Sequence, residues 1–403
     1  MKNYNSKKHL ILVMKKNDKN LIEKFLRFGT HLKDEIFSCM PTRKSRVIYK
    51  KIPKNILVIF PHGIGNMVLF TPVLENLKIN FPDSFIILLL APRNTKEVIT
   101  DSRLFDTIIE YDKNQKNSSQ LFFDIVKIFK NANIDLGLSF SMSAEFPRLM
   151  SLSKVKYRIG FKYNYRKLKD VNYLLHKSVL SDSNKHEVLN YLSVLKLIGI
   201  TDFIIKPCFY FKKNLPYTVR EKLKNDGLNY KKNVVGFHTG SFLDMIEKRW
   251  PPENFAKLGN LLTKNFSVQI VIVGGEEEKN YINKIIDKMD GYVKNLAGTL
   301  NLKETAALIS TMKLFVSNDS GPMHIAAGVG TPVIGIFGPT NEIKNSPWAH
   351  ENQIVKVIRH PMNCAPCYIP YSGKISCKNN KCLRSITPED VFSKCEDILF
   401  NTE

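Results

Sequence analysis

Residues 313–340 constrain the fold more than any other part of this chain. They begin with an apolar run at 314–316, of the kind that forms a buried strand. Turn-forming and helix-starting residues follow at 318–322, and a second apolar run occupies 332–337. The pattern predicts a strand, a short helix over 323–328 and a second strand, joined by tight glycine turns.

Polar side chains fall where such a unit binds ligands. Open parallel sheets bind ligands beyond the carboxyl ends of their strands, and a helix N-terminus at that point favours phosphate. Asp319, Ser320 and His324 lie there, and Gly321 allows the backbone to approach a ligand closely. An ordinary tight crossover would explain the glycines but not three polar side chains. We therefore predict a site for a phosphate-containing ligand.

The same stretch resembles the donor-site motif of glycosyltransferase family 9, the ADP-heptose:lipopolysaccharide heptosyltransferases. That motif reads roughly D-[ST]-G-x-x-H-x-x-A-x-x-x-x-P, and the residues that fill it here are Asp319, Ser320, Gly321, His324, Ala327 and Pro332. The resemblance covers roughly residues 56–391. It implies the GT-B architecture, an α/β fold in which two Rossmann-like domains face each other across a cleft, and it implies a nucleotide-sugar donor.

The order of apolar runs and turns agrees with two such domains. Strand, glycine loop and helix signals occupy residues 55–80, strands and helices then alternate, and the pattern restarts at 234. Residues 201–232 look basic and irregular. We expect an N-terminal extension at 1–54, an acceptor domain at 55–205, an interdomain connection at 206–231 and a donor domain at 232–403.

Several residues are expected to hold the donor diphosphate. The chain has no Asp-x-Asp motif, so we expect no metal cofactor in catalysis, and N–H groups and cations would stabilise the leaving group. Lys248 and Arg249 lie in a segment that resembles the family's K-x-W-P element, although either alone would usually be a solvated surface charge. Thr239, Gly240 and Ser241 match the family's phosphate-facing loop, and hydroxyls and amides suit phosphate oxygens.

Further contacts to the donor follow from position, with alternatives open. Glu277 or Glu278 follows a strand and two glycines, where a carboxylate would bind ribose hydroxyls or only compensate the helix dipole. Asp319 would contact the sugar, as the resemblance implies, or fix its own turn. A lone histidine such as His324 is often structural.

The loop at residues 62–66 departs from the family where the chemistry takes place. The resemblance implies Gly-Asp here, with the Asp as general base, but this chain has Gly65 and Asn66. An amide cannot accept a proton at neutral pH. Either another group takes the proton, or the chemistry or the substrate differs. We interpret His62 as the substitute base ahead of Glu75, because imidazole titrates near neutral pH, and Asn66 as a residue that positions the acceptor. Gly63 and Gly65 would allow close approach of a substrate.

The charge of the chain predicts an anionic partner. The 60 Lys and Arg against 37 Asp and Glu give +23, and residues 1–54 alone have 15 basic and 4 acidic residues. An amphipathic helix near 21–28 would contact an anionic membrane or pack on the first domain. No apolar run reaches the roughly 20 residues of a spanning helix, and 9–14 is too short for a signal peptide. We expect a cytoplasmic protein, at the inner membrane face if the helix binds there.

Four of the 7 cysteines lie close together at residues 364–382, with the spacing Cys364-x2-Cys367-x9-Cys377-x4-Cys382. Two close pairs suit a tetrahedral structural zinc site. Free thiols, or disulfides in an oxidising compartment, are the alternatives. Zinc with four Cys ligands would hold a loop together rather than take part in catalysis.

These features together predict a glycosyltransferase. It would move a heptose or related sugar from a nucleotide sugar, ADP-heptose by resemblance, to an anionic lipopolysaccharide core or similar surface glycan. A nucleotide-sugar epimerase would share the two-domain fold. A non-catalytic glycan- or membrane-binding relative would explain Asn66. Nucleic acid is not expected as a partner, because no nucleic-acid-binding motif is recognisable.

Overall fold

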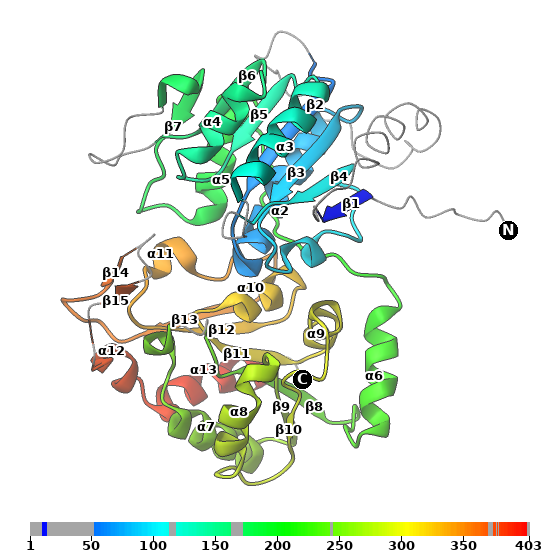
Figure 1. Ribbon diagram of the computed structural model, residues 1–403. Coiled ribbons are helices and arrows are strands. Elements are labelled where there is room, and N and C mark those ends of the chain that lie inside the picture. The colour runs from blue at the N-terminus through cyan, green and yellow to red at the C-terminus, as the bar shows by residue number, and fades with distance from the viewer. Residues whose placement is uncertain are drawn as a thin grey trace, which may run out of the picture. The chain divides into compact units, whose positions relative to one another are not determined.

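The computed structural model describes residues 10–13, 52–112, 118–162, 172–241, 245–369, 374–375, 377 and 379–400. The chain forms two compact units, each built on its own parallel sheet (Figure 1). Unit 1 comprises Met1–Asp182 and Val188–Ile205, and unit 2 comprises Ser183–Glu187 and Lys206–Glu403. Strands and helices alternate in both, so the predicted α/β class with two Rossmann-like units is confirmed.

Unit 1 contains a 7-stranded parallel sheet in the order β1-β4-β3-β2-β5-β6-β7. Its elements are β1 Leu10–Val13, β2 Asn55–Phe60, α2 Ile64–Asn80, β3 Phe85–Leu90, η1 Thr95–Val98, β4 Thr107–Glu110, α3 Ser118–Asn131, β5 Leu136–Ser139, α4 Glu145–Leu152, β6 Tyr157–Phe161, η2 Asn172–Leu174, β7 Lys177–Val179 and α5 Glu187–Lys196. The central strands β2 and β3 are buried from their second residue onward, because helices cover both faces of the sheet.

Unit 2 contains a 6-stranded parallel sheet in the order β10-β9-β8-β11-β12-β13. Its elements are α6 Leu215–Asn225, β8 Asn233–His238, η3 Ile246–Lys248, α7 Pro252–Asn265, β9 Val268–Ile272, η4 Glu276–Glu278, α8 Lys279–Ile286, β10 Val293–Asn295, α9 Leu302–Ile309, β11 Leu314–Asn318, α10 Gly321–Gly328, β12 Val333–Phe337, α11 Glu342–Asn345, β13 Val355–Arg359, β14 Tyr368–Ile369, β15 Lys374–Ile375, α12 Lys381–Arg384 and α13 Pro388–Phe400. β14 and β15 form a small antiparallel pair.

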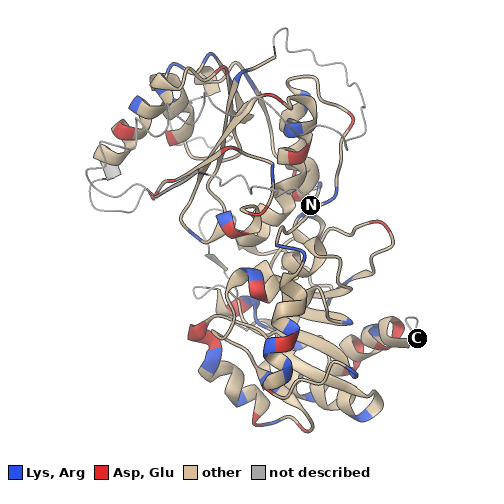
Figure 2. Cartoon of the chain, turned by 90° about the vertical axis from the view of Figure 1, so that its right-hand side faces the viewer, with Lys and Arg blue, Asp and Glu red and all other residues tan. Residues whose placement is uncertain are grey.

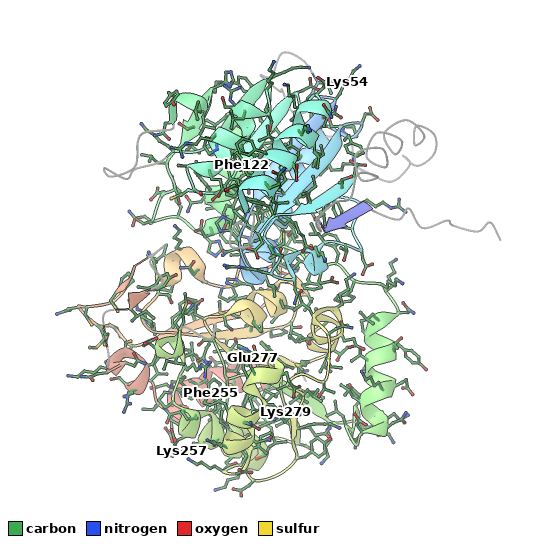
Figure 3. The ribbon with its side chains drawn as sticks, in the orientation of Figure 1. Lys54, Phe122, Phe255, Lys257, Glu277 and Lys279 are labelled. Atoms are coloured by element: carbon green, nitrogen blue, oxygen red, sulfur yellow. The ribbon has the colours of Figure 1, made fainter. Side chains whose placement is uncertain are left out.

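The apolar core of unit 2 lies between its sheet and the helices α7, α8 and α13. Trp250 and Phe255 are among its fully buried side chains, and Phe255 is labelled in Figure 3. Alternate residues of each strand face this core, as the two-residue period of a strand requires. Packing against these helices fixes the positions of the strands, and so also the positions of their carboxyl ends.

β8 occupies the turning point of this second sheet. From β8 the chain continues to β9 and β10 on one side, and later strands β11, β12 and β13 add on the other side. The register pairs His238 of β8 with Ser317 of β11. The next residues, Thr239 just after β8 and Asn318 at the end of β11, therefore lie side by side at the kind of switch point where open α/β sheets bind ligands.

Two local predictions are wrong. Residues 201–232 are not irregular throughout, because Leu215–Asn225 forms α6, which packs against α9. Pro216 lies in the first turn of α6, where proline is tolerated, and so does not break the helix. The glycine loop at 62–66 is also shorter than expected. Gly63 is the N-cap of α2, so Gly65 and Asn66 lie in the first helical turn.

The predicted N-terminal extension is described only in part. Leu10–Val13 forms β1, which pairs in parallel with β4 and so joins the first sheet as an edge strand. The expected amphipathic helix near 21–28 lies outside the described residues. Among the helices that are described, none is long and apolar enough to cross a membrane. Lys and Arg are distributed over the helices of both units with Asp and Glu among them (Figure 2).

Candidate functional site

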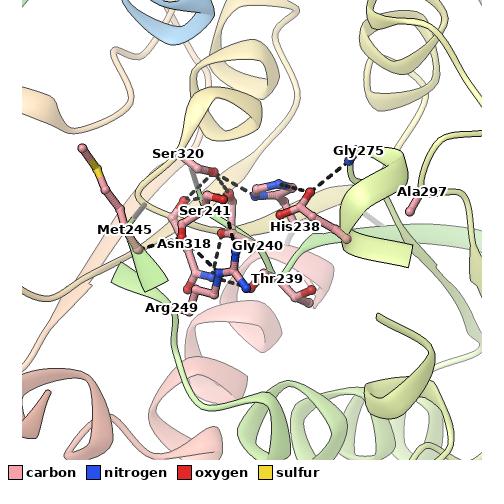
Figure 4. A network of polar contacts seen from close by, with 12 residues as sticks. His238, Thr239, Gly240, Ser241, Met245, Arg249, Gly275, Ala297, Asn318 and Ser320 are labelled. Carbon is pink, nitrogen blue, oxygen red and sulfur yellow. Dashed lines mark hydrogen bonds and ion pairs between the residues drawn. The ribbon is translucent and has the colours of Figure 1, made fainter. Parts of the chain in front are cut away.

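The loop of residues 239–241 follows β8 and is held by one buried side chain. Asn318 is fully buried, and its Nδ2 donates to the carbonyl oxygens of Thr239, at 2.8 Å, and Gly240, at 3.1 Å. Its Oδ1 accepts from the backbone amide of Trp250 at 3.0 Å. Asn318 thus ties the loop to the K-x-W-P segment (Figure 4). In the sequence Asn318 is one of several turn-forming residues, and only its place directly after an apolar run marks it as the polar end of a central strand.

Lys248 forms a buried ion pair with Asp319. The Lys248 Nζ lies 2.8 Å from Asp319 Oδ2, and the two side chains are 15% and 8% exposed. Burial alone would raise the pKa of Asp319, but Lys248, the Thr340 hydroxyl and His324 hold it below its usual value. Asp319 is therefore ionised at neutral pH. Because an ammonium group has three N–H donors, Lys248 could bind a phosphate without leaving Asp319.

Arg249 supports the loop from the other side. Its Nε donates to Ser241 Oγ at 3.1 Å and its Nη2 to the Ser241 carbonyl at 3.4 Å. The guanidinium also lies 5.0 Å from the centre of the Tyr281 ring. Ser241 Oγ in turn donates to the carbonyl of Met245 at 2.7 Å. These contacts make Arg249 a clamp on the loop, and its contact with a donor phosphate stays a prediction.

Trp250 anchors the segment that carries Lys248 and Arg249. It is fully buried, its Nε1 donates to the Ile386 carbonyl at 3.0 Å, and its ring meets Phe255 edge-on at 4.9 Å. Pro251 then forms the N-cap of α7. Lys248, at the end of η3, is therefore two residues from a fixed point.

A line of polar contacts crosses the end of β8 (Figure 4). Ser320 Oγ lies 2.9 Å from His238 Nδ1, and His238 Nε2 lies 3.5 Å from Glu278 Oε2, which also accepts from the Gly275 amide at 2.9 Å. Burial alone would raise the pKa of Glu278, but His238 and the Gly275 amide lower it. Gly240 packs directly against this carboxylate, and a Cβ at Gly240 would overlap Glu278 Oε1. His238 was not predicted, because its partners are distant in sequence.

The two candidate carboxylates after β9 differ in their surroundings. Glu277, labelled in Figure 3, is exposed. Glu278 is buried, and its Oε1 has no hydrogen-bond partner within the described residues. Glu278 is therefore the better placed of the two to accept a hydrogen bond from a ligand hydroxyl. Binding of ribose hydroxyls by Glu277 stays a prediction.

Two more buried polar atoms lie at the same edge. His324 of α10 is 7% exposed, and burial lowers its pKa to about 4, so the imidazole is neutral at pH 7. In the part of the chain that the structure describes, neither His324 Nδ1 nor Thr239 Oγ1 has a hydrogen-bond partner. Buried polar groups without a partner cost free energy. These atoms therefore mark a place where a polar ligand would gain hydrogen bonds.

The first unit places the remaining candidates at the carboxyl end of β2. His62 Nε2 lies 2.8 Å from the carbonyl oxygen of Phe140, just beyond β5. A carbonyl only accepts, so Nε2 is protonated and the lone pair of the neutral ring is on Nδ1. The ring centres of His62 and Phe60 are 4.6 Å apart. Asn66 Oδ1 accepts from the hydroxyl of Tyr191 at 3.3 Å.

Comparison with known proteins identifies this arrangement. The family model described as "Glycosyltransferase family 9 (heptosyltransferase)" matches residues 127–369. The chain belongs to glycosyltransferase family 9. It is 26% identical over 359 residues to lipooligosaccharide heptosyltransferase 2 of Campylobacter jejuni, which covers 86% of this chain and 99% of the relative.

Solved structures agree with the family assignment in fold. The family 9 glycosyltransferase of Veillonella parvula matches with a TM-score of 0.74 and 23% identity, over 87% of this chain and 98% of the other. The Escherichia coli ADP-heptose lipopolysaccharide heptosyltransferase II matches with a TM-score of 0.67 and 21% identity, over 86% and 99%. The predicted α/β fold with two Rossmann-like units is therefore confirmed, and this family 9 member is a glycosyltransferase.

Within the described residues Cys364, Cys367, Cys377 and Cys382 form no disulfide. Burial and then the neighbouring Cys377 and Cys364 raise the pKa of Cys367, whereas backbone N–H groups, Asn379 first, lower that of Cys377. Over the described residues, no group of three or more His, Cys, Asp or Glu is placed to hold a metal ion. Cys364, Cys367, Cys377 and Cys382 are all among the described residues, so the structure does not bring them together as a set of metal ligands. The zinc site formed with Cys382 stays a prediction.

Proposed function

We propose that this glycosyltransferase moves a heptose, or a closely related sugar, from ADP-heptose to a lipopolysaccharide core or similar anionic surface glycan. The observation that carries the proposal is the filled donor motif at the edge of the second sheet, where Asp319 and Lys248 form a buried ion pair. The names of the relatives support the choice of sugar, since they are heptosyltransferases from Campylobacter jejuni and Escherichia coli. Family membership favours a transferase over an epimerase or a non-catalytic binding protein.

In this proposal the second unit holds the donor. The diphosphate would lie against residues 239–241 and Lys248, whose charge and N–H groups stabilise the negative charge that develops as the sugar leaves. Asp319, held ionised beside Lys248, would accept hydrogen bonds from sugar hydroxyls. Glu278 Oε1 and His324 Nδ1 have no partner among the described residues and would gain one from the donor. The site then satisfies its own buried polar atoms when the donor binds.

The first unit would supply the base. As the acceptor oxygen bonds to the anomeric carbon, the carbon–oxygen bond to the diphosphate breaks and its electron pair stays on the diphosphate. The proton of the acceptor hydroxyl passes to His62 Nδ1, because Nε2 is occupied by its bond to the Phe140 carbonyl. Asn66, held by Tyr191, would orient the acceptor rather than take its proton. Attack opposite the leaving group inverts the anomeric centre.

We also propose three further properties. The first is that transfer needs no metal. The second is that a structural zinc ion is held by Cys364, Cys367, Cys377 and Cys382, and the third is that the protein works in the cytoplasm at the inner membrane face, where a lipid-linked acceptor is available. Activity that survives EDTA would support the first point. Mass spectrometry of fresh protein would detect one zinc per chain if the second is right. Sedimentation with anionic vesicles would test the third.

The decisive experiment follows ADP release from ADP-heptose with and without a heptose-deficient lipopolysaccharide acceptor. Acceptor-dependent release is expected. Conversion of the donor without ADP release would favour an epimerase, and donor binding without turnover would favour a non-catalytic protein.

His62→Ala should then lower kcat by about a hundredfold, the range of general-base catalysis. His360→Ala, exposed at the end of β13, is the matched control, and full activity of His62→Ala would remove His62 as the base.

A further inference from the structure

Asn318 directs all of its side-chain hydrogen bonds at two backbone segments of the donor site. It is fully buried at the end of β11, and its partners are the carbonyls of Thr239 and Gly240 and the amide of Trp250. The following residue, Asp319, forms an ion pair with Lys248, which lies two residues before Trp250 in the K-x-W-P segment. Two adjacent residues, the last of β11 and the one just beyond it, therefore hold the loop after β8 and the cation beside it.

The direction of these bonds has a consequence for the loop. In a trans peptide unit the C=O and the N–H point in opposite directions. Both carbonyls that Asn318 binds belong to consecutive peptide units, whose N–H groups are those of Gly240 and Ser241. Because the carbonyls are turned toward Asn318, these two N–H groups are turned away from it. Successive backbone N–H groups that share a direction form an anion-binding concavity.

We propose that Asn318 is a positioning residue for diphosphate binding, which sets the direction of the Gly240 and Ser241 N–H groups and fixes them relative to Lys248. This inference rests on the proposed function, since it assigns the donor diphosphate to that loop. Asn318 acts through the backbone and does not touch the ligand. Its effect is therefore confined to the phosphate part of the donor and leaves nucleoside recognition unchanged.

A second asparagine offers a matched control. Asn76, on α2 in unit 1, is 2% exposed, and its Nδ2 donates to two backbone carbonyls, those of Pro72 and Ile204, both at 2.7 Å. Its Oδ1 accepts from the Ile204 amide at 3.1 Å. The same change at Asn76 and Asn318 therefore removes the same number and kind of bonds, but only Asn318 holds the predicted phosphate loop.

The test compares Asn318→Asp and Asn76→Asp by calorimetric binding of inorganic pyrophosphate. An oxygen in place of Nδ2 would face the carbonyl oxygens of Thr239 and Gly240 and turn the loop. Asn318→Asp should weaken pyrophosphate binding by about tenfold to a hundredfold, because N–H groups turned away from the ligand no longer donate to its charged oxygens. Asn76→Asp should bind like the wild type. Equal binding by all three proteins, or an equal loss in both variants, would overturn the proposal.

Adenosine and ADP separate positioning from general loss of structure. Asn318→Ala should lose ADP affinity by a similar factor while its adenosine affinity remains that of the wild type. If adenosine and ADP binding are both lost, or both kept, Asn318 has no specific role in phosphate binding. Wild-type protein that binds pyrophosphate but prefers another nucleoside diphosphate would refute ADP-heptose as donor without affecting the role of Asn318. Wild-type protein that does not bind pyrophosphate would refute the phosphate loop itself.

Discussion

Replacement of His324 by Gln should remove much of the pH dependence of stability in unit 2. Burial lowers the pKa of His324 to about 4, and the charged or titratable groups that act on it are Asp319, His186 and Lys248. In the unfolded chain a histidine titrates near 6.5. Below pH 6.5 the unfolded state therefore binds a proton that the folded state does not, and the free energy of unfolding decreases as pH falls from about 6.5 to about 4.

The size of the effect follows from the difference between the two pKa values. About 2.5 pKa units correspond to about 3.4 kcal/mol when the titration is complete, and about 2 kcal/mol is already lost at pH 5. Near pH 7.5 the contribution is close to zero. Wild-type protein should therefore lose about 2 kcal/mol more than His324→Gln between pH 7.5 and pH 5. Burial also lowers the pKa of His186, but that histidine is present in both proteins.

Guanidinium denaturation followed by tryptophan fluorescence is a suitable assay. The chain has 2 tryptophans, Trp250 and Trp348, and both belong to unit 2, so the signal reports that unit. His360→Gln, at an exposed position in the same unit, controls for the loss of a histidine as such and should behave like the wild type. If His324→Gln lost as much stability at pH 5 as the wild type, the buried neutral imidazole would not be the cause.

Two further predictions concern the same site and use the same fluorescence assay. Lys248→Met leaves the buried carboxylate of Asp319 without its partner and should cost about 3 kcal/mol or more. The double variant Lys248→Met/Asp319→Asn should recover most of that loss, and a double variant no more stable than Lys248→Met would contradict the buried pair. Gly240→Ala should cost about 1–3 kcal/mol, because its Cβ overlaps Glu278 Oε1. Glu278→Ala in the same chain should relieve the overlap, so strictly additive losses would argue against it.

Local patterns predict the strands and the donor motif because they depend on residues close in sequence. The apolar run, the turn residues and the proline in the first turn around 314–322 specify β11 and the start of α10, whose N-cap is Ser320. Proline is ambiguous by itself, and Pro216 begins α6 where the sequence suggested irregular chain. Leu215, Val219 and Leu223 recur every four residues around it, which is a local helix signal, but it is weak among the many basic residues of that stretch.

The contacts that assemble the site depend on sheet order, which no local pattern contains. Asn318 meets Thr239 only because β11 lies next to β8, although two strands separate them in the chain. The same order brings His238 to Ser320. Local sequence patterns therefore identify the residues that match a motif, but not the residues that support them from a neighbouring strand.

The short segment Ser183–Glu187 belongs to unit 2, while the chain on both sides of it belongs to unit 1. The Ser183 carbonyl accepts from Asn341 Nδ2 at 3.1 Å, His186 Nε2 donates to the Ser346 carbonyl at 2.7 Å, and Glu187 lies 3.2 Å from Lys344 Nζ. A donor half produced from residue 206 onward would lack these partners. Recombination between related enzymes at a single crossover near residue 205 would likewise place residues 183–187 of one parent against α11 of the other parent. The two halves of the chain therefore cannot be exchanged independently. A functional chimaera must take residues 183–187 from the same parent as the C-terminal half.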